Sequence, residues 1–253
     1  MWAAEGTALP EAAGGPPRPG FALLPTAGTQ DDLALEQRLL DQAAEGGAFA
    51  AVWECHPALV VPPTYRRFER FEALCERSAA EGWPVAVRRS GGGLVPQGPG
   101  MVNLSLAWRT PARLSDAMEP VYLGLCALLQ HAFDGFGVQA RAQAVEGSFC
   151  DGRFNLALDG RKAVGTAQYW KRISATEHVV LAHACVLVEA DLALLVHRAN
   201  AFEARLGSDK QYSVDAVANL ADCASAAPTA PALSACSFSQ RLAQAAAQAP
   251  LPC

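Results

Sequence analysis

Residues 88–105 have the sequence RRSGGGLVPQGPGMVNLS, and the rest of the chain is organised around them. It places two arginines, three consecutive glycines and a second glycine pair, Gly98 and Gly100, between two apolar segments with the character of strands. Glycine lets the backbone adopt positive φ and approach a ligand closely, so this density of glycine between strands predicts the wall of a site. Neither common phosphate-loop motif is present, because no Lys-Ser/Thr pair ends the run and Pro96 stands where GxGxxG needs its third glycine.

The chain on either side predicts helices alternating with strands. Asp31 or Asp32 is the expected N-cap of the first helix, and Pro120 is expected in the first turn of the third. The pair Asp159-Gly160 lies between two apolar segments and is typical of a β-hairpin. The expected helices cover 31 to about 46, 68–80, 120–133, 191–206 and 237–247, and the expected strands cover 48–53, 58–61, 85–87, 104–108, 154–158, 163–170 and 179–188.

Strands 85–87 and 104–108 are expected to form a hairpin-like arrangement. In that arrangement Arg88, Arg89 and Ser90 would lie at its mouth, where the first strand leads into the glycines.

The bulk composition bounds the class of protein. The chain has 253 residues, 51% of them hydrophobic, which suits one large domain with a sizeable core. A net charge of -5 argues against a nucleic-acid partner, which usually needs a basic field. The longest apolar run, 179–196, is interrupted by His183, Glu189 and Asp191, so no membrane association is expected. Eight scattered cysteines without a CxxC pair predict free thiols, and no secretory signal is visible, so a cytoplasmic location is expected.

Three stretches together resemble a known family: VRRSGGGLVPQGPGMVNLS (87–105), LALDGRKAVGTAQYWKR (156–172) and LAHACVLVEAD (181–191). Their order and spacing resemble the lipoate-protein ligase and octanoyltransferase family, whose catalytic domain is related to that of biotin protein ligase. The resemblance implies an α/β (α+β) fold in which helices flank a central mixed, largely antiparallel sheet. It also implies a catalytic domain at 21–206. Composition predicts a poorly ordered, Pro- and Gly-rich segment at 1–20 and an Ala/Pro-rich tail at 207–253 with one helix.

The same resemblance implies roles for individual residues. In relatives the Arg-Ser-Gly-Gly-Gly segment lines the acyl pocket, and the lysine of the Gly-Arg-Lys turn, here Lys162, is the key polar residue. A cation beside the carbonyl of an activated acyl group stabilises the charge that develops during transfer. The implied acyl- and substrate-binding residues are Arg89, Ser90, Gly91, Gly92, Gly93, Asn103, Gly165, Thr166 and Ala167, with Gln97 and His183 as further candidates.

Cys150 is the second catalytic candidate. Some octanoyltransferases of this family use a cysteine nucleophile shortly before the Gly-Arg-Lys hairpin, and Cys150 lies in that region. A thiolate that takes an acyl group from a thioester divides the transfer into two easier steps. An inert, half-buried thiol is the alternative for Cys150, and a core histidine is the alternative for His183.

The predicted function is the transfer of an octanoyl or lipoyl group to a lysine of a lipoyl-domain protein, with acyl carrier protein as a candidate donor. Two alternatives stay open. One is an ATP- and Mg-dependent lipoate-protein ligase that forms an acyl-adenylate, although Gln97, Met101 and Pro62-Pro63 depart from the ligase pattern. The other is a binding protein that holds lipoate or a medium-chain fatty acid without transferring it. No metal site is expected for the transferase.

Overall fold

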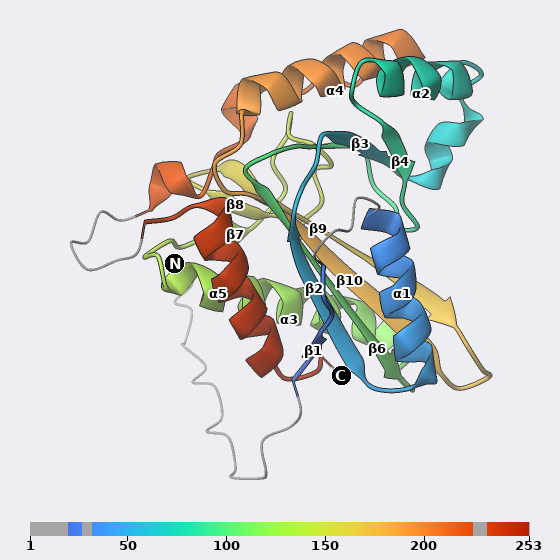
Figure 1. Cartoon of the computed structure of the whole chain (residues 1–253), viewed down its shortest axis with the longest axis vertical. Helices are drawn as coiled ribbons and strands as arrows, with labels where there is room; N and C mark the ends of the chain where they lie inside the picture. The colour runs from blue at the N-terminus through green and yellow to red at the C-terminus, as the bar shows by residue number, and fades with distance from the viewer. Residues whose placement is uncertain (1–19, 27–31, 225–231, 253) are drawn as a thin grey trace, which may run out of the picture.

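The computed structural model describes residues 20–26, 32–224 and 232–252, so the expected segment at 1–19 and the N-cap at Asp31 lie outside the described residues. Two sheets form the framework (Figure 1). The larger has seven strands in the order β1-β2-β6-β10-β9-β8-β7, and the smaller has three in the order β4-β3-β5.

The elements carry the labels of Figure 1. In chain order they are β1 (Ala22–Leu23), α1 (Asp32–Glu45), β2 (Ala48–Glu54), β3 (Ala58–Val61), η1 (Pro63–Arg67), α2 (Phe71–Ala80), β4 (Val85–Val87), β5 (Val95–Gln97), β6 (Met101–Thr110), α3 (Leu114–Asp134), β7 (Arg141–Ala142), β8 (Leu156–Leu158), β9 (Arg161–Arg172), β10 (His178–Leu187), α4 (Leu192–Leu206), η2 (Val214–Ala216), η3 (Ala221–Cys223) and α5 (Ala235–Gln248).

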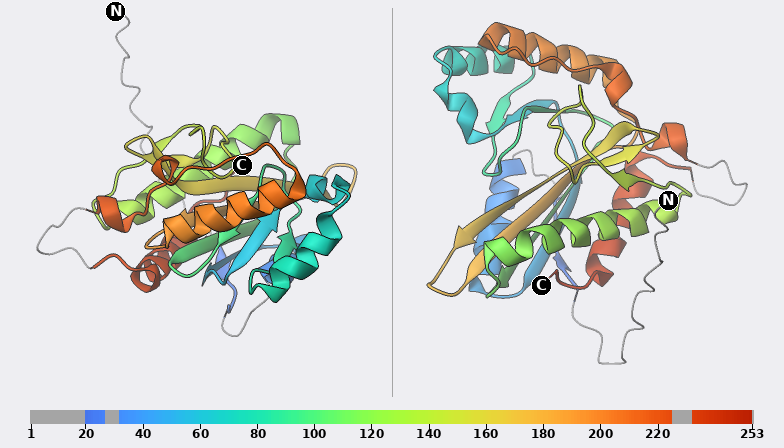
Figure 2. Two further views of the ribbon diagram at one scale, coloured as in Figure 1. Left: turned by 90° about the horizontal axis from the view of Figure 1, so that it is seen from above. Right: turned by 180° about the vertical axis from the view of Figure 1, so that it is seen from behind.

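The centre of the large sheet is the antiparallel set β2, β6, β10 and β9, and the short β1 adds to β2 in parallel. Because successive strand residues point to opposite faces, each long strand serves two cores. On β10, Val180 and Ala182 join the core that α3 and α5 cover, whereas Val179 and Leu181 join the core under α1. Figures 1 and 2 show these helices on the two faces of the sheet. The fold is therefore the mixed α/β arrangement that the motifs predict.

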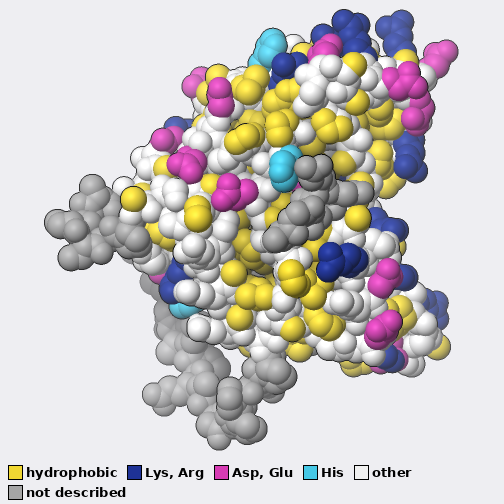
Figure 3. All heavy atoms as spheres, in the orientation of Figure 1, with side chains coloured by type: hydrophobic (Ala, Val, Ile, Leu, Met, Phe, Trp, Pro, Cys, Tyr) yellow, Lys and Arg dark blue, Asp and Glu magenta, His cyan; other side chains and the backbone are white. Residues whose placement is uncertain are grey.

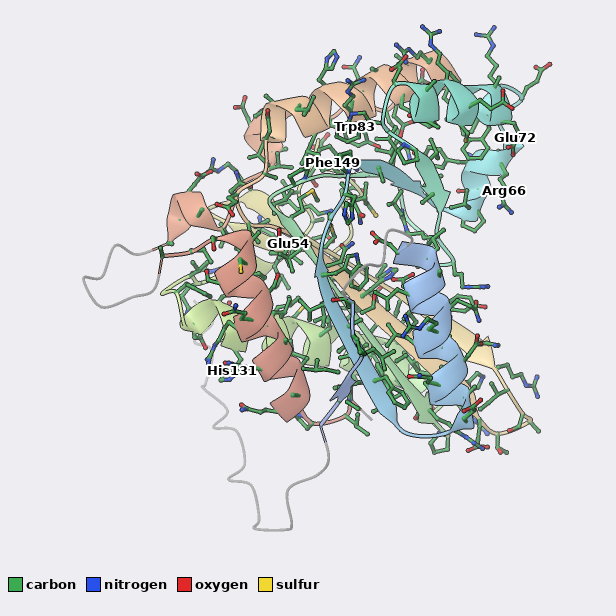
Figure 4. The ribbon with its side chains drawn as sticks, viewed as in Figure 1. Glu54, Arg66, Glu72, Trp83, His131 and Phe149 are labelled. Atoms are coloured by element: carbon green, nitrogen blue, oxygen red, sulfur yellow. The ribbon has the colours of Figure 1, made fainter. Side chains whose placement is uncertain are left out.

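The small sheet carries a third core. It packs under α2 and α4 at one end of the molecule, where Trp83 and Phe149, both labelled in Figure 4, belong to the same buried cluster. Residues after α4 return to the large sheet, since the backbone N–H of Ala218 donates to the carbonyl of Lys162 at 2.9 Å. The expected helix in the C-terminal tail is present as α5, and Phe238 and Leu242 on it are fully buried in the main core.

Three local expectations need correction. Strands β4 and β6 belong to different sheets and form no hairpin, because β4 pairs in parallel with β3. The glycine-rich stretch contains a strand that the proline hid, since β5 places Pro96 opposite Leu59 of β3. Helix α3 begins at Leu114, so Pro120 lies inside it, on an exposed face where water can bond the carbonyl that proline leaves unpaired.

None of the helices in the described part of the chain combines the length and the apolar character needed to span a lipid bilayer.

Gly100 offers a test of the junction between β6 and α4. Its φ is 81°, and a Cβ there would lie 2.6 Å from the carbonyl oxygen of Glu189. Gly160 has nearly the same φ, 80°, but nothing within 4 Å. We expect Gly100→Ala to lower the free energy of unfolding by about 3 kcal/mol or more, and Gly160→Ala by only about 1 kcal/mol, because the second carries backbone strain without a clash. Urea unfolding followed by circular dichroism measures both, and equal losses would contradict the packing described.

Candidate functional site

The floor of the site is set by strand register. Two cross-strand rows run over one face of the large sheet, Trp53–Asn103–Cys185–Gly165 and Ala51–Ser105–His183–Ala167. Both rows lie on the sheet face whose apolar residues pack under α1. Register therefore brings four polar side chains to one surface: Asn103, Ser105, His183 and Cys185.

A cavity of about 420 Å³ opens over this floor, between the two sheets. That volume is in the range of small-molecule sites. Its mainly apolar wall comes from Trp53, Pro57, Val60, Pro84, Val85 and Val95. Its polar wall comes from Asp32, Glu36, His56, Arg88, Gln97, Asn103, Ser105, Cys150, Asn155, Lys162, Thr166, His183 and Cys185. Of the predicted site residues, Gln97, Asn103, Cys150, Lys162, Gly165, Thr166, Ala167 and His183 line the cavity.

The arginine that lines the cavity is Arg88, and Arg89 points away from it. Arg88 is buried and donates to the carbonyls of Val60, Gly91 and Gly93 at 2.7–2.9 Å. Burial lowers the pKa of its guanidinium, but these carbonyls satisfy its donors. Arg89 is exposed, donates to Gln37 and lies 6.0 Å from the ring of Tyr169. Of the two arginines in the glycine-rich stretch, Arg88 therefore lies at the site and Arg89 does not.

The glycine loop that Arg88 holds presses on Cys150. A Cβ on Gly92 would lie 2.5 Å from the Cys150 sulfur, and one on Gly93 would lie 3.8 Å from the Cys150 Cβ. Gly92 also has a φ of 104°, which disfavours any other residue. Gly92 and Gly93 therefore pack against Cys150, but the residues that line the cavity do not include Gly91, Gly92 or Gly93. Gly98 and Gly100 lie close to α4 and to the residues just before it.

Lys162 is buried directly beneath Cys150. Its ammonium donates to the carbonyl oxygens of Phe149 and Cys150, the latter at 2.8 Å. Burial lowers the pKa of Lys162 to about 8, and the nearby thiols and Asp151 oppose that shift. Cys150 itself has a φ of 53°, an uncommon value for a residue with a side chain. Asn155 stabilises this turn by donating to the Cys150 carbonyl at 2.6 Å.

Amide side chains order the rest of the polar wall. Gln97 and Asn103 exchange two hydrogen bonds of 3.3 Å, so each amide is held in one orientation by the other. Thr166 is anchored through its hydroxyl to the carbonyl of Phe154 at 2.8 Å, and its backbone N–H donates to Asn155 at 3.2 Å. These contacts hold the side chains of Gln97, Asn103 and Thr166 in fixed orientations.

Ser90 and His183 meet a residue that sequence reasoning missed, Glu36. His183 Nε2 lies 2.8 Å from Ser90 Oγ, and its Nδ1 lies 2.7 Å from Glu36 Oε1. Ser105 donates to the same carboxylate oxygen at 2.8 Å. A signal for Glu36 was present, since an acidic residue stood on the otherwise apolar stripe of the first helix next to Leu40.

The site can stabilise anionic oxygen and sulfur. It combines a thiol, Cys150, with two buried cations, Arg88 and Lys162, beside a mainly apolar cavity. Within the described residues, no group of three or more His, Cys, Asp and Glu side chains could hold a metal ion.

The burial of Lys162 makes a stability prediction. Its pKa falls from 10.5 to about 8 on folding, so the unfolded chain binds the extra proton between these values and stability should rise with pH there. We expect the free energy of unfolding of the native protein, minus that of Lys162→Met, to increase by about 3 kcal/mol between pH 8 and pH 10.5. Urea titrations at several pH values test this, and a constant difference would show that the lysine is not desolvated.

Comparisons with known proteins show the family of this chain. The family model described as the lipoyl protein ligase A/B catalytic domain matches residues 29–246. The Cupriavidus necator protein H16_B0148, which carries no functional name, is 47% identical over 76% of this chain and 78% of its own. An octanoyl-[GcvH]:protein N-octanoyltransferase from Kyrpidia tusciae is 34% identical over 64% of this chain and 58% of its own, so the match leaves a large part of that enzyme uncovered.

Solved structures show the same fold at low identity. A protein from T. acidophilum with bound lipoic acid superposes with a TM-score of 0.64 at 16% identity, covering 90% of this chain and 84% of its own. Lipoate-protein ligase A bound with ATP superposes with a TM-score of 0.63 at 16% identity, covering 90% and 83%. With a family model that spans most of its length, this chain belongs to the lipoyl protein ligase A/B catalytic-domain family.

Proposed function

We propose that the protein is an octanoyltransferase that carries the acyl group on Cys150 and passes it to a lysine of a lipoyl-domain protein. Membership of the family makes lipoyl or octanoyl transfer the class of reaction. The observation that carries the specific proposal is the packing of Cys150 between the glycine loop and two buried cations at the cavity wall.

The cavity suits a medium-chain acyl group. Its apolar wall can receive the hydrocarbon chain, while Cys150 and Lys162 supply the polar end where the carbonyl would lie. Lipoyl and octanoyl groups share this division between an eight-carbon chain and an activated carbonyl. Both are therefore candidate transferred groups.

The chemistry divides into two half-reactions. The Cys150 thiolate attacks the donor carbonyl, a tetrahedral oxyanion forms, and the donor's leaving group departs to leave an acyl thioester on Cys150. The acceptor lysine then attacks that thioester, and the thiolate leaves. Lys162 has three N–H donors, and two meet backbone carbonyls among the described residues, so the third can stabilise each oxyanion.

Two donor classes fit a cysteine nucleophile. The name of the K. tusciae relative contains an octanoyl-[GcvH] donor, in which the octanoyl group is attached to a protein. We take such an octanoyl protein as the donor for this chain, and octanoyl-acyl carrier protein, a thioester, as the alternative. Figure 3 shows Lys and Arg side chains mixed with acidic ones over α2 and the neighbouring end of α4. A partner protein that binds this surface can contact both positive and negative side chains.

Mass spectrometry of Cys150 tests the central step. We expect protein incubated with octanoyl-[GcvH] or octanoyl-acyl carrier protein to gain one octanoyl group on Cys150, and Cys150→Ala to form no adduct and to lose transfer. Supplying lipoate with ATP is the companion assay. Pyrophosphate release and lipoylation that survive in Cys150→Ala would replace this proposal with the ligase, and acid binding without any transfer would replace it with the binding protein.

Gly92 tests the seating of the nucleophile. Gly92→Ala should slow the formation of octanoyl-Cys150 by about 100-fold or more, because its Cβ would displace the sulfur from its position against the loop. Gly82→Ala is the matched control, since Gly82 also has positive φ but lies after α2 with nothing within 4 Å. We expect that control to lose stability and keep its rate. A Gly92→Ala variant that acylates normally would show that the loop does not position Cys150.

A further inference from the structure

Ser90, His183 and Glu36 form a hydrogen-bonded series beside Cys150 and Lys162, the two residues that carry the proposed half-reactions. Its members come from three elements: the glycine loop, β10 and α1. The contacts are close, at 2.8 Å and 2.7 Å, and the carboxylate is further held by Ser105. All are buried or nearly so, with 15% of the His183 side chain exposed where it lines the cavity.

Glu36 determines which nitrogen of His183 is basic. Burial raises the pKa of Glu36, but the interaction with His183 and the hydrogen bonds from His183 and Ser105 outweigh it and leave the pKa below its usual value. Glu36 is therefore a carboxylate, which accepts a hydrogen bond from Nδ1–H. The neutral ring then carries its lone pair on Nε2, where the hydroxyl of Ser90 donates.

The proposed reaction needs a base at this place. A free lysine has a pKa of about 10.4, so at neutral pH the acceptor arrives as an ammonium ion that cannot attack a thioester. Lys162 donates hydrogen bonds to two carbonyl oxygens, and Arg88 donates to three. Both act as hydrogen-bond donors here and not as proton acceptors. Among the described residues that line the cavity, His183 is the group whose accepting nitrogen is oriented by a buried carboxylate.

Building on the proposed octanoyl transfer, we propose that His183 is the general base that deprotonates the acceptor lysine, with Ser90 relaying the proton and Glu36 positioning the ring. The ammonium gives a proton to Ser90 Oγ as the Ser90 hydroxyl proton moves to Nε2. The neutral amine attacks the thioester carbonyl, the C–N bond forms, and the C–S bond breaks to release the Cys150 thiolate. Glu36 stabilises the imidazolium that results.

The same residues serve an amide donor in reverse. When Cys150 attacks an octanoyl group held as an amide, the departing lysine amine must gain a proton, and protonated His183 supplies it through Ser90. A thioester donor needs no such proton, because a thiolate leaves readily without one. His183 is thus required whenever the group bonded to the carbonyl is an amine, and dispensable when it is a thiol.

Ser90 fits a relay better than a nucleophile. Ser90 is 2% exposed and its hydroxyl is held by His183 Nε2, so its oxygen has less room for a tetrahedral acyl carbon than the Cys150 sulfur has. A relay needs only one hydrogen bond to the hydroxyl. Cys150, which does line the cavity, remains the group that can contact the acyl carbon.

The experiment separates the half-reactions by choosing acyl donor and amine. Octanoyl-coenzyme A loads Cys150, and the loaded protein is then given either a lipoyl domain with its target lysine or hydroxylamine, an amine that is already neutral at pH 7. We expect His183→Asn to load normally and to release the octanoyl group to hydroxylamine at the native rate. Its transfer to the lipoyl domain should fall by about 100-fold or more. From octanoyl-[GcvH], the same variant should fail to load.

Further variants test the roles of Ser90 and Glu36. Ser90→Ala and Glu36→Gln should reproduce the selective loss, and His197→Asn, on the exposed face of α4, is the control that should behave as native protein. Equal losses toward lysine and hydroxylamine would reduce His183 to a structural role, and a selective loss in His56→Asn would move the base to His56. Native transfer by Ser90→Ala would overturn the relay. Failure of native protein to load Cys150 would instead refute the proposed octanoyl transfer.

Discussion

The in-register pairing of β10 between β6 and β9 is the constraint on which the site depends. Nine consecutive residue pairs join β10 to β9, and ten join it to β6. A slip of one residue would send His183 and Cys185 to the face buried by α3 and α5, and would bring Val180 and Ala182 toward the cavity. The hydrophobic alternation that builds two cores therefore also specifies which side chains can reach the acyl group.

A second dependence runs through Arg88. A glycine loop can approach a thiol closely, but it leaves backbone carbonyls without partners in a buried place. The guanidinium of Arg88 satisfies two of these carbonyls and ties the loop to β3 through a third. It also places a positive charge near Cys150 and Lys162. One side chain thus supports the loop and sets the electrostatics of the nucleophile.

The buried charges of the site oppose stability and are arranged to serve chemistry. Burying a charged side chain costs desolvation free energy, so apolar residues in place of Lys162 and Glu36 would serve the stability of the fold at least as well. Instead, Lys162 donates to two carbonyls of the Cys150 turn, and Glu36 accepts hydrogen bonds from His183 and Ser105. Such groups with perturbed pKa values and exact partners are typical of catalytic sites rather than of packing. The left-handed backbone at Cys150 belongs to the same arrangement.

Much of the fold follows from local pattern. Alternation and helical periodicity predicted β2, β3, β4, β9, β10, α1, α4 and α5 to within a few residues, because each signal is contained in the segment itself. The turn at Asp159-Gly160 was equally local. The family resemblance, which the match over 29–246 confirms, identified the glycine loop and the lysine turn.

The orientation of Arg88 and the contact between Glu36 and His183 depend on residues far apart in the sequence, so only the tertiary structure shows them. Arg88 and Arg89 are adjacent and chemically identical, and only the pairing of β4 with β3, which ends beside them, determines that Arg88 points inward. Glu36 stands 147 residues from His183, so no local signal could join them. Most of the long helices and strands and the family could be read from the sequence, because these rest on short-range periodicity and motif. The network around His183 emerged only when long-range register brought helix, loop and strand together.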